Sequence, residues 1–327
     1  MTPNTATDVV VDPRPPADVG ATVVALPVWP GDDDSGPWIG PGAAEVDGIG
    51  ADVYEALERE SATGNAGRLV TVPTSGDGSV ERVLLVGVGD GSPAMYRRAG
   101  AAVARAARGV DRLASTVTAM ASDAELRAFV EGVLLAPYAL RRPSVAKAPL
   151  GTLVLASTDA SRSATADLGR AVSGAAWLAR DLVHTPSNVK DPAWLAERAR
   201  EVGTAAGVTV RVRDERELAA DGFGGIVAVG MGSIRPPRLI ELSYTPEHPH
   251  ARSPHVVLVG KGITYDSGGL SLKPREAMVP MKTDMSGGAV VIGVVSALRA
   301  VGCQVRVTGL VPAAENMPAE RRSGPAT

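Results

Sequence analysis

The chain has 327 residues, of which 45% are hydrophobic and 21% charged, and its formal net charge is −3. This length predicts two domains, and the composition is typical of a soluble globular protein without the concentrated basic face that nucleic-acid binding requires. No signal-peptide pattern or membrane-length apolar run is recognisable, and Cys303 is the sole cysteine. We therefore expect a cytoplasmic protein with no intrachain disulfide and with neither nucleic-acid nor membrane partners.

The first part of the chain predicts a leader followed by an α/β domain. Residues 1–19 are rich in Pro, Thr and Asp, which indicates a disordered leader. From residue 20 to residue 160, candidate strands alternate with candidate helices, as in an N-terminal α/β domain. The strands are expected at residues 21–28, 67–73, 82–88 and 150–157, and the helices at residues 93–108 and 123–135.

A glycine-rich turn, Gly87-Val88-Gly89-Asp90-Gly91-Ser92, lies between one of these strands and the next helix. A strand, a glycine turn and a helix in this order also occur in nucleotide-binding dehydrogenases. The third glycine of that fingerprint would fall at Ser92, and no strand ending in an acidic residue follows about twenty residues later. The sequence therefore favours a plain tight turn over a nucleotide site.

Residues 161–327 predict a second α/β domain. Asp191 is expected to cap a helix that starts at Pro192, because a short acidic side chain followed by proline is a typical helix start. The segment 286–300 is apolar on nearly all sides and is therefore expected to form a buried helix. A further helix is expected at residues 164–183, and strands at 208–212, 225–229, 239–244, 255–259 and 304–311.

One glycine-rich stretch between apolar segments contains charged residues, and charged groups in such a location indicate a ligand or an ion-pair partner. It runs from Gly260 to Gly269 and continues through Lys273 to the segment 281–285. Of the 33 basic residues, only five are lysines, and three of these five (Lys261, Lys273, Lys282) lie here. An amine can lose its proton and bind a metal, whereas a guanidinium cannot.

These residue types fit a metal site. Asp266 and Asp284 offer hard oxygen ligands, and Lys261 can offer a neutral nitrogen to an ion such as zinc or manganese. Lys273 can stay charged and stabilise an oxyanion during acyl transfer. Ordinary loop ion pairs are the alternative, but the surrounding glycines favour close approach of the backbone to a small ligand.

The same residues carry a family resemblance. Val-Gly-Lys-Gly-Ile-Thr-Tyr-Asp-Ser-Gly-Gly-Leu-Ser-Leu-Lys-Pro and Met-Lys-Thr-Asp-Met-Ser-Gly-Gly-Ala closely resemble motifs of the leucyl (cytosol) aminopeptidases, the M17 metallopeptidases. The resemblance extends upstream through Ala179-Arg180-Asp181-Leu182-Val183-His184-Thr185-Pro186-Ser187-Asn188 and covers the chain from about residue 164 to residue 318.

The resemblance implies a two-metal exopeptidase that releases N-terminal amino acids, such as leucine, from peptides. Lys261, Asp266 and Asp284 match metal ligands, with Asp266 bridging the two ions, and Lys273 matches the catalytic lysine. Met281 matches a residue that lines the pocket for the first side chain of the substrate. The implied cofactors are two manganese or zinc ions with bicarbonate as a base, and the implied assembly is a homohexamer in the cytoplasm.

The sequence also departs from the family. The second family motif, Asn-Thr-Asp-Ala-Glu-Gly-Arg, which supplies two further carboxylates and the arginine that holds bicarbonate, is absent. One lysine and two aspartates cannot fill two coordination spheres of about four to six ligands each. We therefore expect a truncated or frameshifted member: an N-terminal α/β domain plus an incomplete C-terminal α/β catalytic domain (residues 161–327) around a central mixed sheet. Alone it would be weakly active or inactive, and a non-catalytic binding or regulatory protein of the same fold is the alternative.

Overall fold

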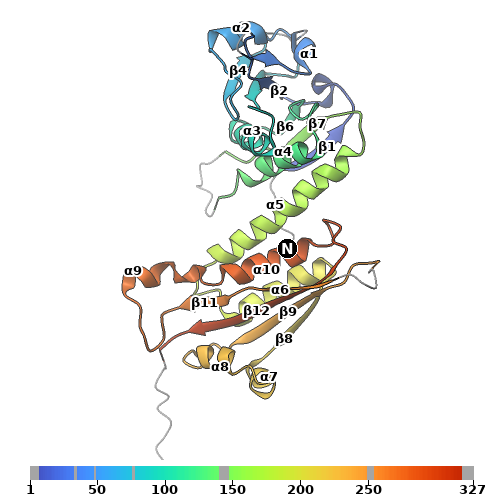
Figure 1. Cartoon of the computed structure of the whole chain (residues 1–327). Coiled ribbons are helices and arrows are strands. Elements are labelled where there is room, and N and C mark those ends of the chain that lie inside the picture. The colour runs from blue at the N-terminus through green and yellow to red at the C-terminus, as the bar shows by residue number, and fades with distance from the viewer. Residues whose placement is uncertain are drawn as a thin grey trace, which may run out of the picture. The chain divides into compact units, whose positions relative to one another are not determined.

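The computed structural model describes residues 7–32, 35–47, 49–75, 78–139, 147–248 and 254–318 (Figure 1). These residues form two compact units, and the division falls between Ser173 and Gly174. That position lies inside helix α5 (Arg162–His184), whereas the sequence predicts a boundary ahead of this helix, between residues 160 and 161. Residues 319–327 of the predicted second domain lie outside the described part.

The first unit is built on a mainly parallel sheet, in which seven strands are seen among the described residues. Strand β2 is buried along six of its seven residues, as expected for a strand covered on both faces. Among the strands described in this sheet, β4 and β3 alone run antiparallel to their neighbours. The strand order is β1 (Asp8–Asp12), β7 (Thr152–Ala156), β6 (Arg112–Ser115), β2 (Val23–Trp29), β5 (Arg82–Gly87) and β4 (Leu69–Pro73), with β3 (Trp38–Ile39) at the end of β2.

Helices cover both faces of this sheet. Alternate residues of β2 and β5 join two different clusters of buried side chains, because successive side chains of a strand point to opposite faces. Helices α3 (Pro93–Ala106) and α4 (Asp123–Leu135) contribute to one cluster. Helices α1 (Ala43–Asp47) and α2 (Val53–Arg59) contribute to the other. The predicted α/β class is confirmed for this unit.

The start of the chain corrects one prediction. Residues 8–12 form β1, which pairs in parallel with β7, and a short 3-10 helix, η1, covers Pro16–Val19. The prediction of a disordered leader is therefore wrong for residues 8–19, while residues 1–6 lie outside the described part. The run Val9–Val11 has high strand propensity, and Val9 is only 1% exposed, so burial outweighs the polar composition of the segment.

The second unit contains a mixed sheet, as predicted. Strands β10 (His255–Val259) and β11 (Gly262–Asp266) follow one another along the same side of β12 (Arg306–Asn316), and both are parallel to it. On the other side of β12, β9 (Arg238–Tyr244) pairs antiparallel, and β8 (Thr209–Arg213) pairs antiparallel with β9. Strand β12 is therefore central among the strands that the structure describes in this unit.

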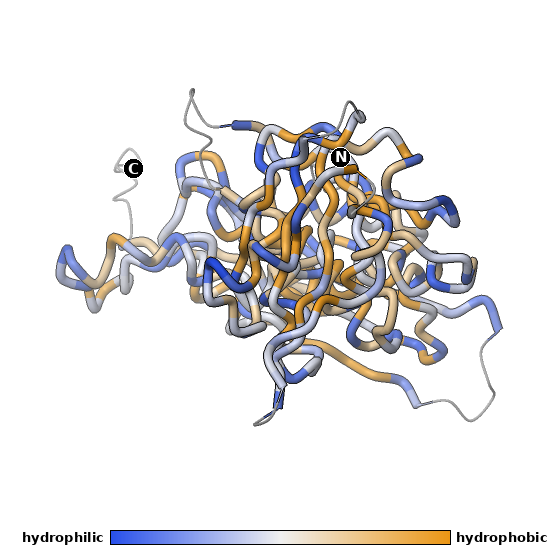
Figure 2. Tube along the Cα trace, turned by 90° about the horizontal axis from the view of Figure 1, so that it is seen from above, coloured by the Kyte–Doolittle hydropathy of each residue, from blue (hydrophilic) through white to orange (hydrophobic). Residues whose placement is uncertain are grey.

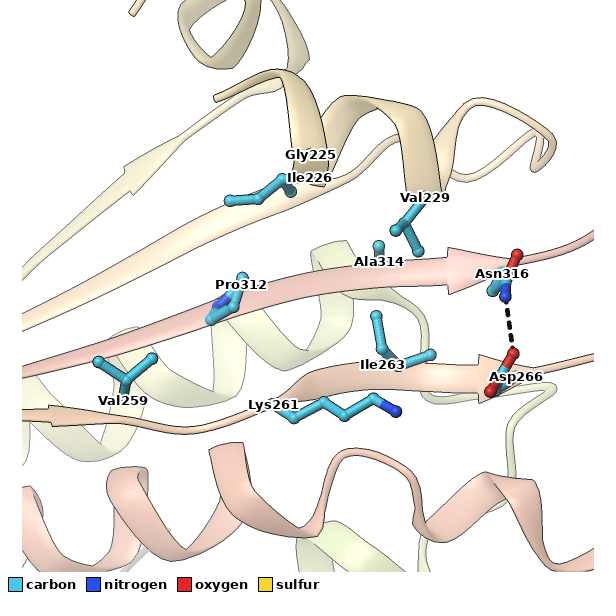
Figure 3. Close-up of a pocket in the computed structure, with 10 residues that line it drawn as sticks. All are labelled: Gly225, Ile226, Val229, Val259, Lys261, Ile263, Asp266, Pro312, Ala314 and Asn316. Atoms are coloured by element: carbon cyan, nitrogen blue, oxygen red, sulfur yellow. Dashed lines mark hydrogen bonds between the residues drawn. The ribbon is translucent and has the colours of Figure 1, made fainter. Parts of the chain in front are cut away.

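Helices lie on both faces of the second sheet. Helices α6 (Pro192–Ala205) and α10 (Ser286–Ala297) share a buried cluster with the sheet, and the side chain of Asp191 caps α6 as predicted. Helix α8 (Gly224–Gly230), preceded by α7 (Glu215–Ala220), lies on the opposite face from α10 (Figure 3). The predicted strand at residues 225–229 is wrong, because the periodicity of a short apolar run cannot distinguish a strand from a helix turn. Helix α9 (Arg275–Met278) and the 3-10 helix η2 (Val279–Thr283) connect β11 to α10.

Figure 2 shows hydrophobic residues gathered in the interior and hydrophilic residues at peripheral turns. The outer side of β10 is an exception, because Val257 is 51% exposed and Val259 is 70% exposed. On α10, Val290 and Val294 are also exposed, so the prediction of a buried helix is wrong for the side of α10 that carries them.

Among the described residues, no strand pairs with the outer edge of β10 or β11. None of the described helices is long and apolar enough to cross a membrane.

The exposed face of β10 generates a prediction about self-association. An uncovered, apolar strand edge is a template for non-specific pairing between chains. We expect Val257→Lys to reduce light scattering at high protein concentration, with a change in the free energy of unfolding within about 0.5 kcal/mol. Val307→Lys on the neighbouring strand β12 is the control, because Val307 is 4% exposed and a buried charge there should unfold the unit. Equal scattering by wild type and Val257→Lys would contradict the prediction.

Candidate metal and active site

The register between β11 and β12 positions the first acidic residue of the site. Ile263 lies opposite Ala314, but Tyr265 lies opposite Glu315, so β11 carries a one-residue bulge at Thr264. A bulge inserts one extra residue into a strand and shifts the pairing beyond it. Because of this shift, Asp266 lies directly opposite Asn316 at the ends of the two strands.

Buried polar contacts hold the bulge and the end of β12. Thr264 is fully buried, and its carbonyl accepts a hydrogen bond from Ser187 Oγ at 3.2 Å. Arg235 Nη1 donates to the carbonyl of Ser187 and to Glu315 Oε1, both at 3.0 Å. Ser233 Oγ donates to the other oxygen of Glu315 at 2.5 Å. Upstream segments therefore fix the strand ends that carry the site.

Asp266, at the end of β11, accepts hydrogen bonds from three directions. Its Oδ1 accepts from Asn316 Nδ2 at 2.7 Å and from the backbone amide of Gly268 at 3.0 Å, and its Oδ2 pairs with the ammonium group of Lys273. Burial alone would raise the pKa of Asp266, but these contacts, led by that of Lys273, hold the pKa below its usual value. The carboxylate is therefore ionised at neutral pH, as a metal ligand must be.

Lys261 and Asp284 form the second pair of the site. Lys261 lies in the interruption between β10 and β11, and Asp284 follows the last residue of η2. Lys261 Nζ lies 2.6 Å from Asp284 Oδ2. This oxygen is buried and forms no hydrogen bond of good geometry within the described structure, so the ion pair is its sole polar contact there. A buried carboxylate oxygen with spare acceptor capacity suits a bound cation.

Glycines allow α10 to approach this pair closely. The backbone amide of Gly288 donates to the carbonyl of Lys261 at 2.8 Å. A Cβ atom on Gly260 would lie 2.3 Å from the carbonyl oxygen of Gly287, and one on Gly288 would lie 2.6 Å from a methyl group of Val311. Residues larger than glycine are therefore excluded at Gly260 and Gly288.

A cavity of about 450 Å³ opens beside Lys261 and Asp266 (Figure 3). Its floor is formed by β11 and β12, and α8 forms the opposite wall, with Ile226 and Val229 pointing toward the strands. The lining is mainly apolar, and its polar groups gather at the end where Asp266 meets Asn316. The lining residues are Gly225, Ile226, Val229, Val259, Lys261, Ile263, Asp266, Pro312, Ala314 and Asn316.

The structure brings some of the predicted site residues into direct contact and leaves others apart. Lys261 contacts Asp284, Lys273 contacts Asp266, and Lys261 and Asp266 share the cavity. Met281 lies in η2, half-buried and outside the cavity lining. Sequence reasoning gave Asn316 no role, although its segment resembles the family. The predicted strand at residues 304–311 stops five residues before Asn316, so the position of Asn316 at the end of β12 was not available as a signal.

The donor set fits part of a metal centre. Lys261, Asp266 and Asp284 offer one nitrogen and four carboxylate oxygens, a combination that suits zinc or manganese. Among the described residues, no three His, Cys, Asp or Glu side chains come together. The lysine is therefore required to complete even a three-residue set, in line with its position against Asp284.

Comparison with family models gives two matches. The model described as the catalytic domain of the cytosol aminopeptidase family matches residues 177–325. The model described as the N-terminal domain of the same family matches residues 36–142. The two matches are in the order of the two structural units.

Curated relatives and solved structures give the same result. A probable cytosol aminopeptidase of Rhodococcus erythropolis is 37% identical over a match that covers 84% of this chain and 56% of its own length. A probable cytosol aminopeptidase of Rhodococcus opacus is 36% identical, and the match covers 94% of this chain and 62% of the relative. The bottromycin maturation enzyme BotP, in complex with Mn, has a TM-score of 0.73 at 34% identity, covering 91% of this chain and 60% of that chain. A tomato leucine aminopeptidase mutant, with a TM-score of 0.77 at 24% identity over 98% of this chain and 65% of that chain, shares the fold. The chain thus spans about three fifths of the length of the curated relatives that it matches.

The tight contact between Gly269 and Asn316 generates a prediction. Gly269 has a φ of +60°, and a Cβ atom there would lie 2.7 Å from Asn316 Oδ1, whose side chain holds Asp266. We expect Gly269→Ala to lower the free energy of unfolding by about 2–3 kcal/mol, from backbone strain and from displacement of Asn316. The measurement is denaturant unfolding of the full chain.

Gly222→Ala is the matched control, because Gly222 has a φ of +81° and open space around its Cβ position. It should show only the backbone penalty of about 1–2 kcal/mol. An equal loss of stability in the two variants would mean that the Asn316 contact carries no energy.

Proposed function

Because the chain belongs to the cytosol aminopeptidase family, we propose that it is a metal-dependent aminopeptidase unit acting on the N-terminal residue of peptides. The observation that carries this proposal is that Lys261, which pairs with Asp284, and Asp266, which pairs with Lys273, line the same cavity. The two carboxylates and Lys261 offer cation ligands, Lys273 offers a charged donor beside Asp266, and the mainly apolar cavity offers room for a side chain. Peptides are the proposed substrates.

Lys261, Asp266 and Asp284 would hold divalent metal. Bound manganese or zinc supplies Lewis-acid activation of water and of the scissile carbonyl. Lys261 must release its proton to act as a ligand, since only the neutral amine has a free electron pair. The donors that complete two coordination spheres would come from outside the described residues, and so would an arginine for bicarbonate, because no arginine lines the cavity.

Lys273 has a different role in the proposal. Its side chain is 28% exposed and its ammonium group contacts Asp266, so it would lie beside the proposed ion while keeping a path to substrate. In its charged form it donates a hydrogen bond to the oxygen that becomes negative as the carbonyl is attacked, and such donors contribute most to acyl-transfer catalysis. Met281, on η2, would contact the first side chain of the substrate. By family analogy we also propose a homohexamer and a cytoplasmic location.

The proposal is tested by titrating Mn²⁺ into the purified full chain and assaying hydrolysis of leucyl amide. We expect at most one weakly bound ion per chain and slow hydrolysis, because the described donors fill only part of two coordination spheres. Asp266→Asn should abolish Mn²⁺ binding. Lys273→Ala should lower any hydrolysis by about 10²- to 10³-fold and leave Mn²⁺ affinity within a few-fold.

Lys147→Ala is the matched control, since Lys147 is an exposed lysine of the other unit and should leave both measurements unchanged. Unchanged Mn²⁺ binding in Asp266→Asn would overturn the ligand assignment. No binding by wild type would favour the alternative, a non-catalytic binding protein of the same fold. Hydrolysis that survives in Lys273→Ala would remove Lys273 from the mechanism.

A further inference from the structure

A buried lysine outside the cavity links the end of α5 to the segment that carries Asp284. Lys190 is 0% exposed and lies directly before the Asp191 cap of α6. Its Nζ donates to three backbone carbonyls: Leu182 at 2.9 Å, Val183 at 2.9 Å and Lys282 at 2.8 Å. An ammonium group has three donors, so all three are used.

Burying the ammonium group of Lys190 costs free energy, so packing alone does not explain a lysine at this position. A buried ammonium group is strongly unfavourable unless hydrogen bonds replace its water, and an apolar side chain could fill the same volume. Two of its acceptors belong to the last turn of α5, where carbonyls lack helical partners and a positive charge is favourable. Burial, with the nearby charge of Lys282, lowers the pKa of Lys190 to about 8, so the charged form predominates at neutral pH. The third acceptor, the carbonyl of Lys282, is 92 residues away in the chain.

The side chain of Lys282 reinforces the same connection. Its Nζ lies 3.4 Å from the carbonyl oxygen of His184, the last residue of α5. Lys190 therefore binds carbonyls of both α5 and η2, and Lys282, which belongs to η2, binds a carbonyl of α5. None of the residues of η2 is fully buried, and Val279 at its start is 67% exposed, so apolar packing holds this segment weakly.

The position of η2 determines where the second carboxylate lies. Asp284 follows η2 directly, and its amide donates to the carbonyl of Met281 at 3.2 Å. Its Oδ2 lies 2.6 Å from Lys261 Nζ, so a shift of the η2 backbone by a fraction of an ångström would change this contact. The carbonyl held by Lys190 is two residues before Asp284.

We propose that Lys190 is a positioning residue that, together with Lys282, fixes the η2 backbone so that Asp284 faces Lys261 in the metal site. This inference rests on the proposed metal site, but the fixation of η2 can be measured without metal. Groups that orient metal ligands typically change metal affinity by about 10- to 100-fold when they are removed.

The test uses Lys190→Met in the full chain, which keeps the length of the side chain and removes its charge and donors. Hydrogen exchange of the amides of residues 279–285 should become faster, and the Kd for Mn²⁺, measured by calorimetry, should rise by about 10-fold. Leu195→Ala is the control for general destabilisation, because Leu195 is a fully buried residue of the same core. It should lower the unfolding temperature without a selective change in residues 279–285 or in Mn²⁺ affinity.

Lys282→Met provides a second variant if Lys190→Met does not fold, since the side chain of Lys282 is only half-buried. It should accelerate the same amides to a smaller extent, and Lys282→Arg, which keeps a donor, should restore them. Unchanged exchange at residues 279–285 in the folded variants would overturn the inference, and so would faster exchange with an unchanged Mn²⁺ affinity. If wild type binds no Mn²⁺ while exchange still accelerates, the proposed function fails and the fixation of η2 by the lysines stands.

Discussion

The pairing of β11 with β12, shifted by one residue at Thr264, is the constraint on which the rest of the site depends. Without the bulge, Asp266 would lie one position beyond Asn316 and would lose its 2.7 Å hydrogen bond. A strand shifted by one residue also turns its side chains to the opposite face. The bulge therefore determines both the partner of Asp266 and the face of the sheet on which its carboxylate lies.

The shift is maintained by groups that lie outside the cavity. Ser187 binds the carbonyl at the bulge, and Arg235 joins Ser187 to Glu315, the residue before Asn316. Thr264 and Glu315 are buried, so removing the groups that bind them would leave a buried carbonyl and a buried carboxylate with fewer hydrogen bonds in a medium of low dielectric, where this is costly. The candidate site is thus supported in layers, because Asp266 lies at the end of β11 and partly buried polar contacts hold the end of β12 beside it.

From the sequence, charged residues in an unusual location were proposed as site residues, and the structure pairs them with one another. Lys261, Asp266, Lys273 and Asp284 were identifiable because charged groups in a glycine-rich stretch between apolar elements need a ligand or a partner. Asn316 was not identifiable in the same way, because its role depends on a register between strands 50 residues apart that a bulge decides. Lys190 was missed because a lysine after a helix usually faces solvent, and only the folded chain shows three carbonyls around it.

The same limit applies to the elements. The start of α6 was predictable from its capping residue and proline, and apolar strands such as β10 were predictable from their patterns. The run at residues 225–229 was assigned as a strand but forms α8, because five apolar residues are compatible with either state. At residues 8–12, the local valine run outweighed the composition of the surrounding segment. Errors therefore fall where tertiary contacts decide between local alternatives.

The two walls of the cavity differ in how much change they can accept. Next to the lining residue Lys261, a Cβ atom on Gly260 would lie 2.3 Å from the carbonyl oxygen of Gly287, so no larger residue is tolerated at this position. On the other side, Gly224 and Gly225 at the start of α8 have open space at their Cβ positions, and Ile226 and Val229 reach the cavity only through their side chains. A different cavity shape would therefore arise from substitutions in α8, while the residues of β11 and β12 that line the cavity stay unchanged.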